Sequence, residues 1–170
     1  GKTYNAILTV KSIPQAQAYY DLLKRVKAGE MRVKVSERVK QVLPDFPKAT
    51  ITYSVTENEE DSRANQDHMK QVLEDYNQEF DTHFTMADLR SFNTDVNNRL
   101  ARKQDKYLYR NEQLDLVIVV NRLLTGFDAP CLSTLFIDRK PMQPQDLIQA
   151  FSRTNRIFDS SKTYGHIITF

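Results

Sequence analysis

Two arginines and a glutamine recur at helical spacing near the end of the chain. Gln149, Arg153 and Arg156 occupy positions i, i+4 and i+7, so they share one face of an expected helix. Arginine suits phosphate because its planar guanidinium stays charged and donates parallel hydrogen bonds to two oxygens. No carboxylate interrupts the stripe. The pattern favours an anion-binding face, and a solvated basic face is the simpler alternative.

A short polar segment precedes this helix. Thr125, Gly126 and Asp128 come shortly after a strongly apolar run. The glycine would let the backbone approach a ligand closely, and the threonine offers a hydroxyl and an amide to a phosphate. Asp128 offers a carboxylate to a ribose hydroxyl or to a partner arginine. A strand-to-loop turn stabilised by glycine and aspartate explains the same residues without a ligand.

The surrounding pattern indicates a parallel sheet. Residues 114–120 are almost all apolar or β-branched, as in a central strand that is covered on both faces. Alternation of strands and helices predicts an α/β fold with a parallel sheet and helices on both faces. Ligands gather at the carboxyl ends of such strands, which is where residues 125–128 would lie. The other expected strands are residues 6–10, 49–55, 134–137 and 164–170. In the helix expected at residues 143–155, three side chains should face the sheet: Leu147, Ile148 and Phe151.

Helical segments are expected between the first strand and the central one. Ser12 and Pro14 open the first helix, and Gly29 suits its C-terminal end. Residues 30–43 are ambiguous between strand and helix, and a helical face is slightly preferred: Val35, Val39 and Val42.

Two amphipathic helices follow between residues 61 and 110. The second starts at Thr85, which forms a capping-box pattern with Asp88. The apolar positions of the first helix are Met69, Val72, Leu73, Tyr76 and Phe80. Those of the second are Met86, Leu89, Phe92, Val96 and Leu100.

The composition is that of a single globular domain. Of 170 residues, 40% are apolar and 27% charged, and the net charge is +2. No apolar run approaches the length of a membrane span, so no membrane association is expected. A single cysteine, Cys131, favours a reducing cytoplasmic location. Residues 57–81 hold nine acidic and two basic side chains, whereas residues 90–110 hold six basic and two acidic. Two solvated helix faces or a basic strip facing a phosphate backbone both explain this asymmetry.

Two other patterns are rejected. Gly1, Lys2 and Thr3 imitate the end of a Walker A loop, but the strand and the glycine that should precede them are missing and a strand follows. The three histidines have no metal-ligand spacing with Cys131 or with one another, so no metal site is expected.

Taken together, the two polar segments resemble motifs V and VI of superfamily 2 helicases and translocases. Residues 123–130, Leu-Leu-Thr-Gly-Phe-Asp-Ala-Pro, are especially similar to type I restriction enzyme R subunits. Residues 149–156 match motif VI at Gln149, Arg153 and Arg156, whereas Ser152 and Asn155 stand where the generic motif has glycines. The R-subunit branch commonly shows these two substitutions. Residues 6–12 would be motif IV, on a weaker signal.

This resemblance implies a second RecA-like motor domain spanning residues 1–170, with a helical insertion at about residues 61–110. ATP with Mg²⁺ would be shared with a first RecA-like domain that supplies the Walker A and B residues. Arg153 and Arg156 would be catalytic arginine fingers. Gln149, Asp128 and Gly126 would belong to the nucleotide site or its coupling to DNA. Thr125, Lys11 and Ser12 would contact double-stranded DNA.

The resemblance also implies partners: the first motor domain and nuclease domain of the same chain, and the methylation and specificity subunits of a restriction complex. The chain is expected to be a piece of a longer protein and to be inactive alone. Two alternatives stay open. One is another superfamily 2 motor, such as a repair helicase or a remodelling translocase. The other is a non-catalytic α/β module whose basic stripe binds an acidic partner. The insertion could pack on the motor core, on DNA or on a neighbouring domain.

Overall fold

Five parallel strands form one sheet in the order β2-β3-β1-β4-β5. This is seen in a computed structural model that describes residues 3–52, 63–120, 130–139, 143–154 and 165–170. The first strand in the sequence, β1, therefore lies at the centre, between β3 and β4. The strands are β1 Asn5–Val10, β2 Ala49–Thr52, β3 Leu116–Val120, β4 Leu132–Asp138 and β5 His166–Thr169.

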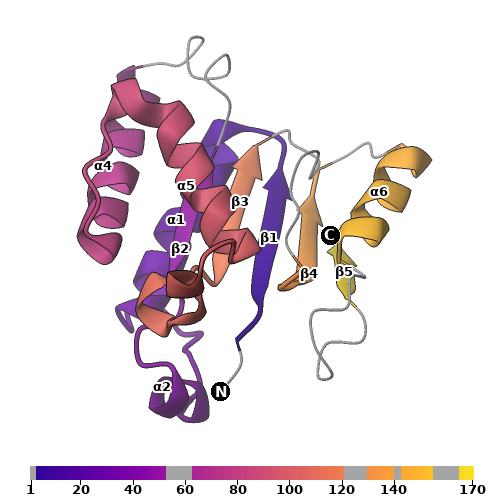
Figure 1. The fold of residues 1–170 in the computed structure, drawn as a ribbon, viewed down its shortest axis with the longest axis horizontal. Coiled ribbons are helices and arrows are strands. Elements are labelled where there is room, and N and C mark those ends of the chain that lie inside the picture. The colour runs from indigo at the N-terminus through magenta and orange to yellow at the C-terminus, as the bar shows by residue number, and fades with distance from the viewer. Residues whose placement is uncertain (1–2, 53–62, 121–129, 140–142, 155–164) are drawn as a thin grey trace.

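Helices cover both faces of the sheet (Figure 1). α1 packs on β1, β2 and β3, α6 packs on β4 and β5 on the opposite face, and α4 packs beside α1 at the β2 edge. α5 lies in front of the sheet in Figure 1, on the same side as α6, whereas α1 lies behind it. The α/β parallel sheet with helices on both faces, as predicted from the sequence, is confirmed. The helices are α1 Ile13–Lys27, α2 Glu37–Val42, α4 Arg63–Phe80, α5 Leu89–Ala101 and α6 Pro144–Thr154.

The two helices between residues 61 and 110 belong to the main hydrophobic core. All five apolar residues predicted for α4 are buried. In α5, Leu89, Phe92, Val96 and Leu100 are buried as predicted, and they join the same core as the sheet residues Ile7, Val117 and Leu135. The predicted capping box of Thr85 and Asp88 is present in a short 3-10 turn, Met86–Asp88. The sequence leaves three packing partners open for this segment: the core of the same domain, DNA or a neighbouring domain. The structure shows the first, because the segment packs on the sheet and on α1.

The ambiguous residues 30–43 contain only the short helix α2. Its predicted apolar face does not enter the core: Val42 is 66% exposed and Val39 is half-buried. A six-residue helix makes too few turns to cover the sheet, so its valines stay near the surface. The strand predicted at residues 49–55 is described as far as Thr52, and its remainder lies outside the described residues.

The ends of α1 follow the sequence prediction. Ser12 caps its N-terminus, where its Oγ accepts the backbone N–H of Gln15. Gly29 follows the helix with φ of 76°, a left-handed conformation that glycine adopts without strain. None of the described helices is long and apolar enough to cross a lipid bilayer.

Candidate functional site

The carboxyl edge of the sheet brings three strand ends together. Val10, the last residue of β1, is in register with Val120 of β3 and Asp138 of β4. Lys11 and Ser12 therefore lie beside the carboxyl end of β3, which the next connection follows in the sequence. That connection holds Thr125, Gly126 and Asp128, which lie outside the described residues. The structure thus places Lys11 and Ser12 at the predicted edge and leaves the other three untested.

Lys11 and Ser12 form the turn between β1 and α1. Lys11 is exposed, and its ammonium group has no ion pair within the described part of the chain. The Ser12 hydroxyl accepts the backbone N–H of Gln15 at 3.3 Å. A hydroxyl accepts and donates at once, so Ser12 caps the helix and still has its own proton to donate. Within the described residues, both side chains keep a donor that could meet an anion at this edge.

Asp138 also lies at this edge, although no sequence pattern singles it out. One carboxylate oxygen, Oδ2, accepts hydrogen bonds from the Tyr19 hydroxyl at 2.6 Å and from Gln15 Nε2 at 2.7 Å. Gln15 Oε1 in turn accepts the backbone N–H of Lys11 at 3.1 Å. The hydrogen bond to Asp138, together with burial, raises the pKa of Tyr19 to about 12. The Ser-x-x-Gln spacing of Ser12 and Gln15 is a capping pattern that could have drawn attention to Gln15.

Two residues of the arginine stripe, Gln149 and Arg153, lie on α6. Gln149 is exposed, and its backbone carbonyl accepts the Ser152 hydroxyl at 2.7 Å. Arg153 is helical in its backbone, but its side chain and all of Arg156 lie outside the described residues. The prediction that Ile148 faces the sheet is wrong, because its side chain is 68% exposed. Ile148, Gln149 and Ser152 are adjacent on one open face of the helix, so that face is not used by the described fold.

α6 runs back from the carboxyl edge along the sheet. It follows β4, and its last residue, Thr154, is buried where the chain enters β5. A Cβ atom built on Gly165 would lie 2.2 Å from the Thr154 carbonyl oxygen, so helix end and strand start are in close contact. Eleven residues span about 16 Å. The backbone of Arg153 therefore lies toward the start of β5, at the opposite end of the strands from the Lys11 turn.

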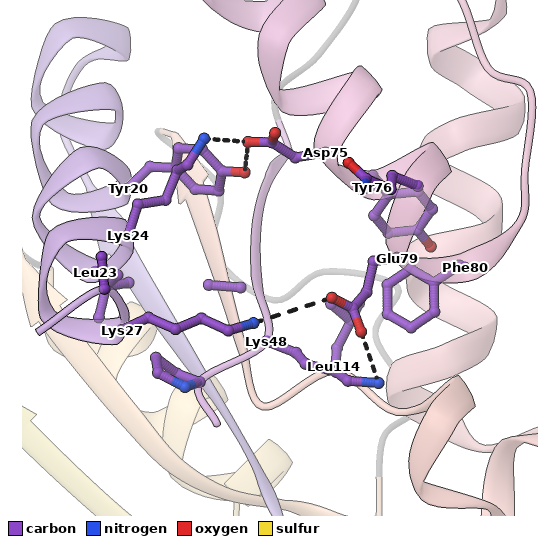
Figure 2. A pocket seen from close by; sticks show the side chains of 14 residues that line it. Tyr20, Leu23, Lys24, Lys27, Lys48, Asp75, Tyr76, Glu79, Phe80 and Leu114 are labelled. Carbon is purple, nitrogen blue, oxygen red and sulfur yellow. Dashed lines mark hydrogen bonds and ion pairs between the residues drawn. The ribbon is translucent and has the colours of Figure 1, made fainter. Parts of the chain in front are cut away.

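A cavity of about 580 Å³ lies at the other end of the sheet, between α1, α4 and the start of β2 (Figure 2). Lysines that line it form ion pairs with acidic residues of α4. Lys24 Nζ lies 2.6 Å from Asp75 Oδ2, and Lys48 Nζ lies 3.0 Å from Glu79 Oε1. Burial acts to raise the pKa of Asp75, but hydrogen bonds from Lys24, Tyr20 and Gln71 outweigh it and hold that pKa below its usual value. No pattern in the sequence indicates this cavity.

Buried ion pairs fill the space beside that cavity. Arg99, 2% exposed, donates to Asp95 at 2.8 Å and to Glu112 at 2.6 Å, and its guanidinium lies 4.0 Å from the centre of the Phe80 ring. Arg110 binds both oxygens of Asp115, at 2.5 and 2.8 Å. Two arginines of the basic segment 90–110 thus have partners inside the fold. Neither a solvated face nor a strip facing DNA describes these two.

Metal binding has no support in the described ranges. Within them, no group of three or more His, Cys, Asp or Glu side chains is arranged to hold a metal ion. His68 instead lies 3.0 Å from Asp21 Oδ1, and Cys131 is buried.

Comparisons with known proteins give the chain a family. The family described as "Type I restriction enzyme subunit R domain 3" matches residues 2–170. The endonuclease subunit of type I restriction enzyme SauMRSORF196P from Staphylococcus aureus (strain MRSA252) is 31% identical over 175 residues, which cover 99% of this chain and 17% of the relative. The subunit of SsaAORF53P from Staphylococcus saprophyticus is 32% identical over 174 residues, again covering 99% and 17%.

Among solved structures, the ATP-dependent Type ISP restriction-modification enzyme LlaBIII bound to DNA matches with a TM-score of 0.37 and 16% identity. The match covers 99% of this chain and 12% of that chain. The family assignment rests on the sequence matches. The chain spans about a sixth of the length of the curated relatives that it matches. It belongs to the family of domain 3 of the type I restriction enzyme subunit R.

Proposed function

We propose that this chain is the second motor domain of an ATP-driven translocase of double-stranded DNA, within the endonuclease subunit of a type I restriction enzyme. The observation that carries the proposal is the sequence spacing of Gln149, Arg153 and Arg156, of which the first two lie on α6, in a family of restriction enzyme subunits. The open face at Ile148 and Gln149 supports it, because a composite site needs a helix surface that another domain can cover.

ATP fits this helix as a shared ligand. Arg153 and Arg156 would bind the γ-phosphate and stabilise the negative charge that develops during its transfer, and Gln149 would orient the helix. Gly126 and Asp128 would lie between the nucleotide and the DNA contact. The described residues offer no metal cluster, so the ligands of Mg²⁺ would come from the preceding domain and from the nucleotide itself.

Double-stranded DNA would be held at the carboxyl edge. Lys11, Ser12 and Thr125 would contact its phosphates, a role that suits an exposed ammonium with no ion pair to the described residues and a hydroxyl that can still donate its proton. The separation of this edge from the end of α6 agrees with two different ligands, one held by each. The first motor domain, the nuclease domain, and the methylation and specificity subunits remain the proposed protein partners.

The test uses the full-length endonuclease subunit assembled with its partner subunits. Arg153→Ala and Arg156→Ala should each lower DNA-dependent ATP hydrolysis by about 10³-fold or more, since arginine fingers contribute that much to the rate of phosphoryl transfer. DNA binding should be retained. The matched control is Arg90→Ala, which removes an exposed arginine of α5 and should leave ATP hydrolysis unchanged.

Normal ATP hydrolysis in both arginine variants would exclude the arginine-finger role. If those variants instead lost a protein partner and kept ATP hydrolysis, the chain would be a non-catalytic interaction module. The isolated chain should not hydrolyse ATP, because it holds no Walker A or B residues, and with a net charge of +2 it should bind DNA only weakly.

A further inference from the structure

Among the described residues of the carboxyl edge, the Asp138 cluster is a group to which the proposed function gives no task. It consists of Asp138, Gln15 and Tyr19, and it ties the end of β4 to the turn between β1 and α1. The turn holds Lys11 and Ser12, the proposed phosphate contacts. Through Gln15, the cluster contacts the backbone of Lys11, a proposed DNA contact. None of its three members carries a positive charge that would attract DNA.

We propose that Asp138 is a positioning residue that acts through Gln15 to hold the Lys11–Ser12 turn in the conformation that binds a DNA phosphate. The inference rests on the proposed function, since Lys11 must be a phosphate contact for its position to matter. Asp138 itself would touch neither DNA nor nucleotide.

The Gln15 amide is held in one orientation by its partners. An amide has one end that donates and one that accepts, whereas an ionised carboxylate only accepts. Asp138 at 2.7 Å therefore selects the amino end of Gln15, and the carbonyl end is left to accept the Lys11 N–H at 3.1 Å. With the amide reversed, two oxygens would face each other and the Lys11 N–H would face an amino group.

Gln15 also takes part in the capping of α1. Gln15 supplies its backbone N–H to the Ser12 hydroxyl and its side-chain oxygen to Lys11, so one residue holds the turn from both sides. Tyr19, one turn further along α1, donates to the same carboxylate oxygen from the helix side. Asp138 is thus the fixed point on β4 against which the start of α1 is aligned.

The charge of Asp138 distinguishes a positioning role from a purely electrostatic one. A carboxylate beside a phosphate contact repels DNA, so removing its charge should by itself tighten DNA binding. Positioning predicts the opposite sign. Loss of Asp138 should weaken DNA binding, because Lys11 then loses its alignment with the phosphate.

The experiment measures duplex DNA affinity of the full-length endonuclease subunit, in its complex, over a series of salt concentrations. Log affinity falls against log salt, and each phosphate contact adds about 0.9 to the magnitude of that slope. Lys11→Ala should therefore reduce the magnitude of the slope by about 0.9. Asp138→Ala should lower it by the same amount and weaken binding about threefold to tenfold at moderate salt. The double variant should show no further change in slope.

Two variants serve as matched controls. Gln15→Ala keeps the Asp138 charge but breaks the link to Lys11, so it should lower the slope as Asp138→Ala does. Tyr19→Phe removes the other hydrogen bond to Asp138 and leaves the link through Gln15 intact, so its slope should be that of the unmodified protein. A change that merely reduced the folded fraction would lower the apparent affinity at every salt concentration and leave the slope unaltered.

The outcomes are distinguishable. An unchanged slope in Lys11→Ala removes the phosphate contact from the proposed function, and the inference with it. A lowered slope in Lys11→Ala, with unchanged slopes in Asp138→Ala and Gln15→Ala, overturns the inference alone. Tighter binding by Asp138→Ala, or additive changes in the double variant, also overturns it.

Discussion

Gly165 lies so close to Thr154 that any added Cβ atom would come within 2.2 Å of the Thr154 carbonyl oxygen. The obstacle is backbone, which cannot swing aside as the end of a flexible side chain can. Gly165 therefore sets how closely the C-terminal end of α6, and Arg153 with it, approaches the start of β5.

Gly165→Ala should destabilise the protein by about 1–3 kcal/mol, the usual cost of forcing an extra carbon into a packed site. The matched control is Gly29→Ala, which meets no atom within 4 Å and should cost only about 1 kcal/mol for its left-handed backbone. Urea denaturation of the three proteins measures the difference. A loss for Gly165→Ala no larger than that for Gly29→Ala would contradict the close-contact argument.

Lys48→Met should lower the free energy of unfolding by about 3 kcal/mol, because it leaves Glu79, Asp45 and two backbone carbonyls without their buried cation. The control is Lys27→Met. Lys27 also faces Glu79 across the cavity, but at 4.0 Å and 39% exposed, so its loss should cost under about 1 kcal/mol. Equal effects of the two substitutions would show that burial of the Lys48 pair does not matter.

Arg99→Lys should cost about 2 kcal/mol although it preserves the charge. One ammonium group cannot replace a guanidinium that donates to Asp95 and Glu112 at once while lying over the Phe80 ring. Arg90→Lys, on the exposed side of the same helix, should fall within about 0.5 kcal/mol of the unmodified protein. The midpoint of denaturant unfolding, at an unchanged denaturant dependence, reports both values.

Tyr19 should make stability depend on pH in the alkaline range. Its pKa is raised to about 12 in the folded protein from 10.0 in the unfolded chain, so the folded state favours the neutral phenol. This stabilisation is fully present below about pH 10 and is lost as the pH rises toward 12. Tyr19→Phe should therefore weaken the fall in stability over that window.

The same pH window allows a direct check on Asp138. In Asp138→Asn the Tyr19 hydroxyl no longer faces a carboxylate, so the pKa of Tyr19 should fall toward its ordinary value. Ultraviolet absorbance of the tyrosinate, compared between the unmodified protein and Tyr19→Phe in each background, isolates this one tyrosine. An unchanged titration in Asp138→Asn would mean that the hydrogen bond does not set the pKa.

The spacing of apolar residues along the sequence correctly predicted which face of each long helix is buried. α4 and α5 bury the side chains that their helical periodicity selects, since a long amphipathic helix has one dry face whatever it packs against. The same logic failed at Val42, where α2 is too short to reach the core, and at Ile148, whose face is left open by the described fold. Periodicity identifies an apolar face, but it does not identify the surface that covers it.

Polar pairings across the fold could not be predicted. Gln15 and Asp138 are 123 positions apart and meet only because β1 and β4 are neighbours in register. Lys48 is a charged residue that any pattern assigns to the surface, yet its side chain is 3% exposed because Asp45 and Glu79 lie within reach. For Thr125, Gly126, Asp128 and Arg156 the sequence remains the whole basis of the proposed roles.

The central place of β1 has a consequence for how the protein is made. Its neighbours on both sides, β3 and β4, are synthesised more than 100 residues later, as the pairing of Ala6 with Leu116 and Thr134 shows. A nascent chain on the ribosome therefore carries the innermost strand of the sheet with both edges unpaired until residues 116–138 have emerged. Such long-range pairing is slow and exposes strand edges to aggregation. We expect this domain to depend on chaperones during synthesis more than a domain of equal size built from local hairpins.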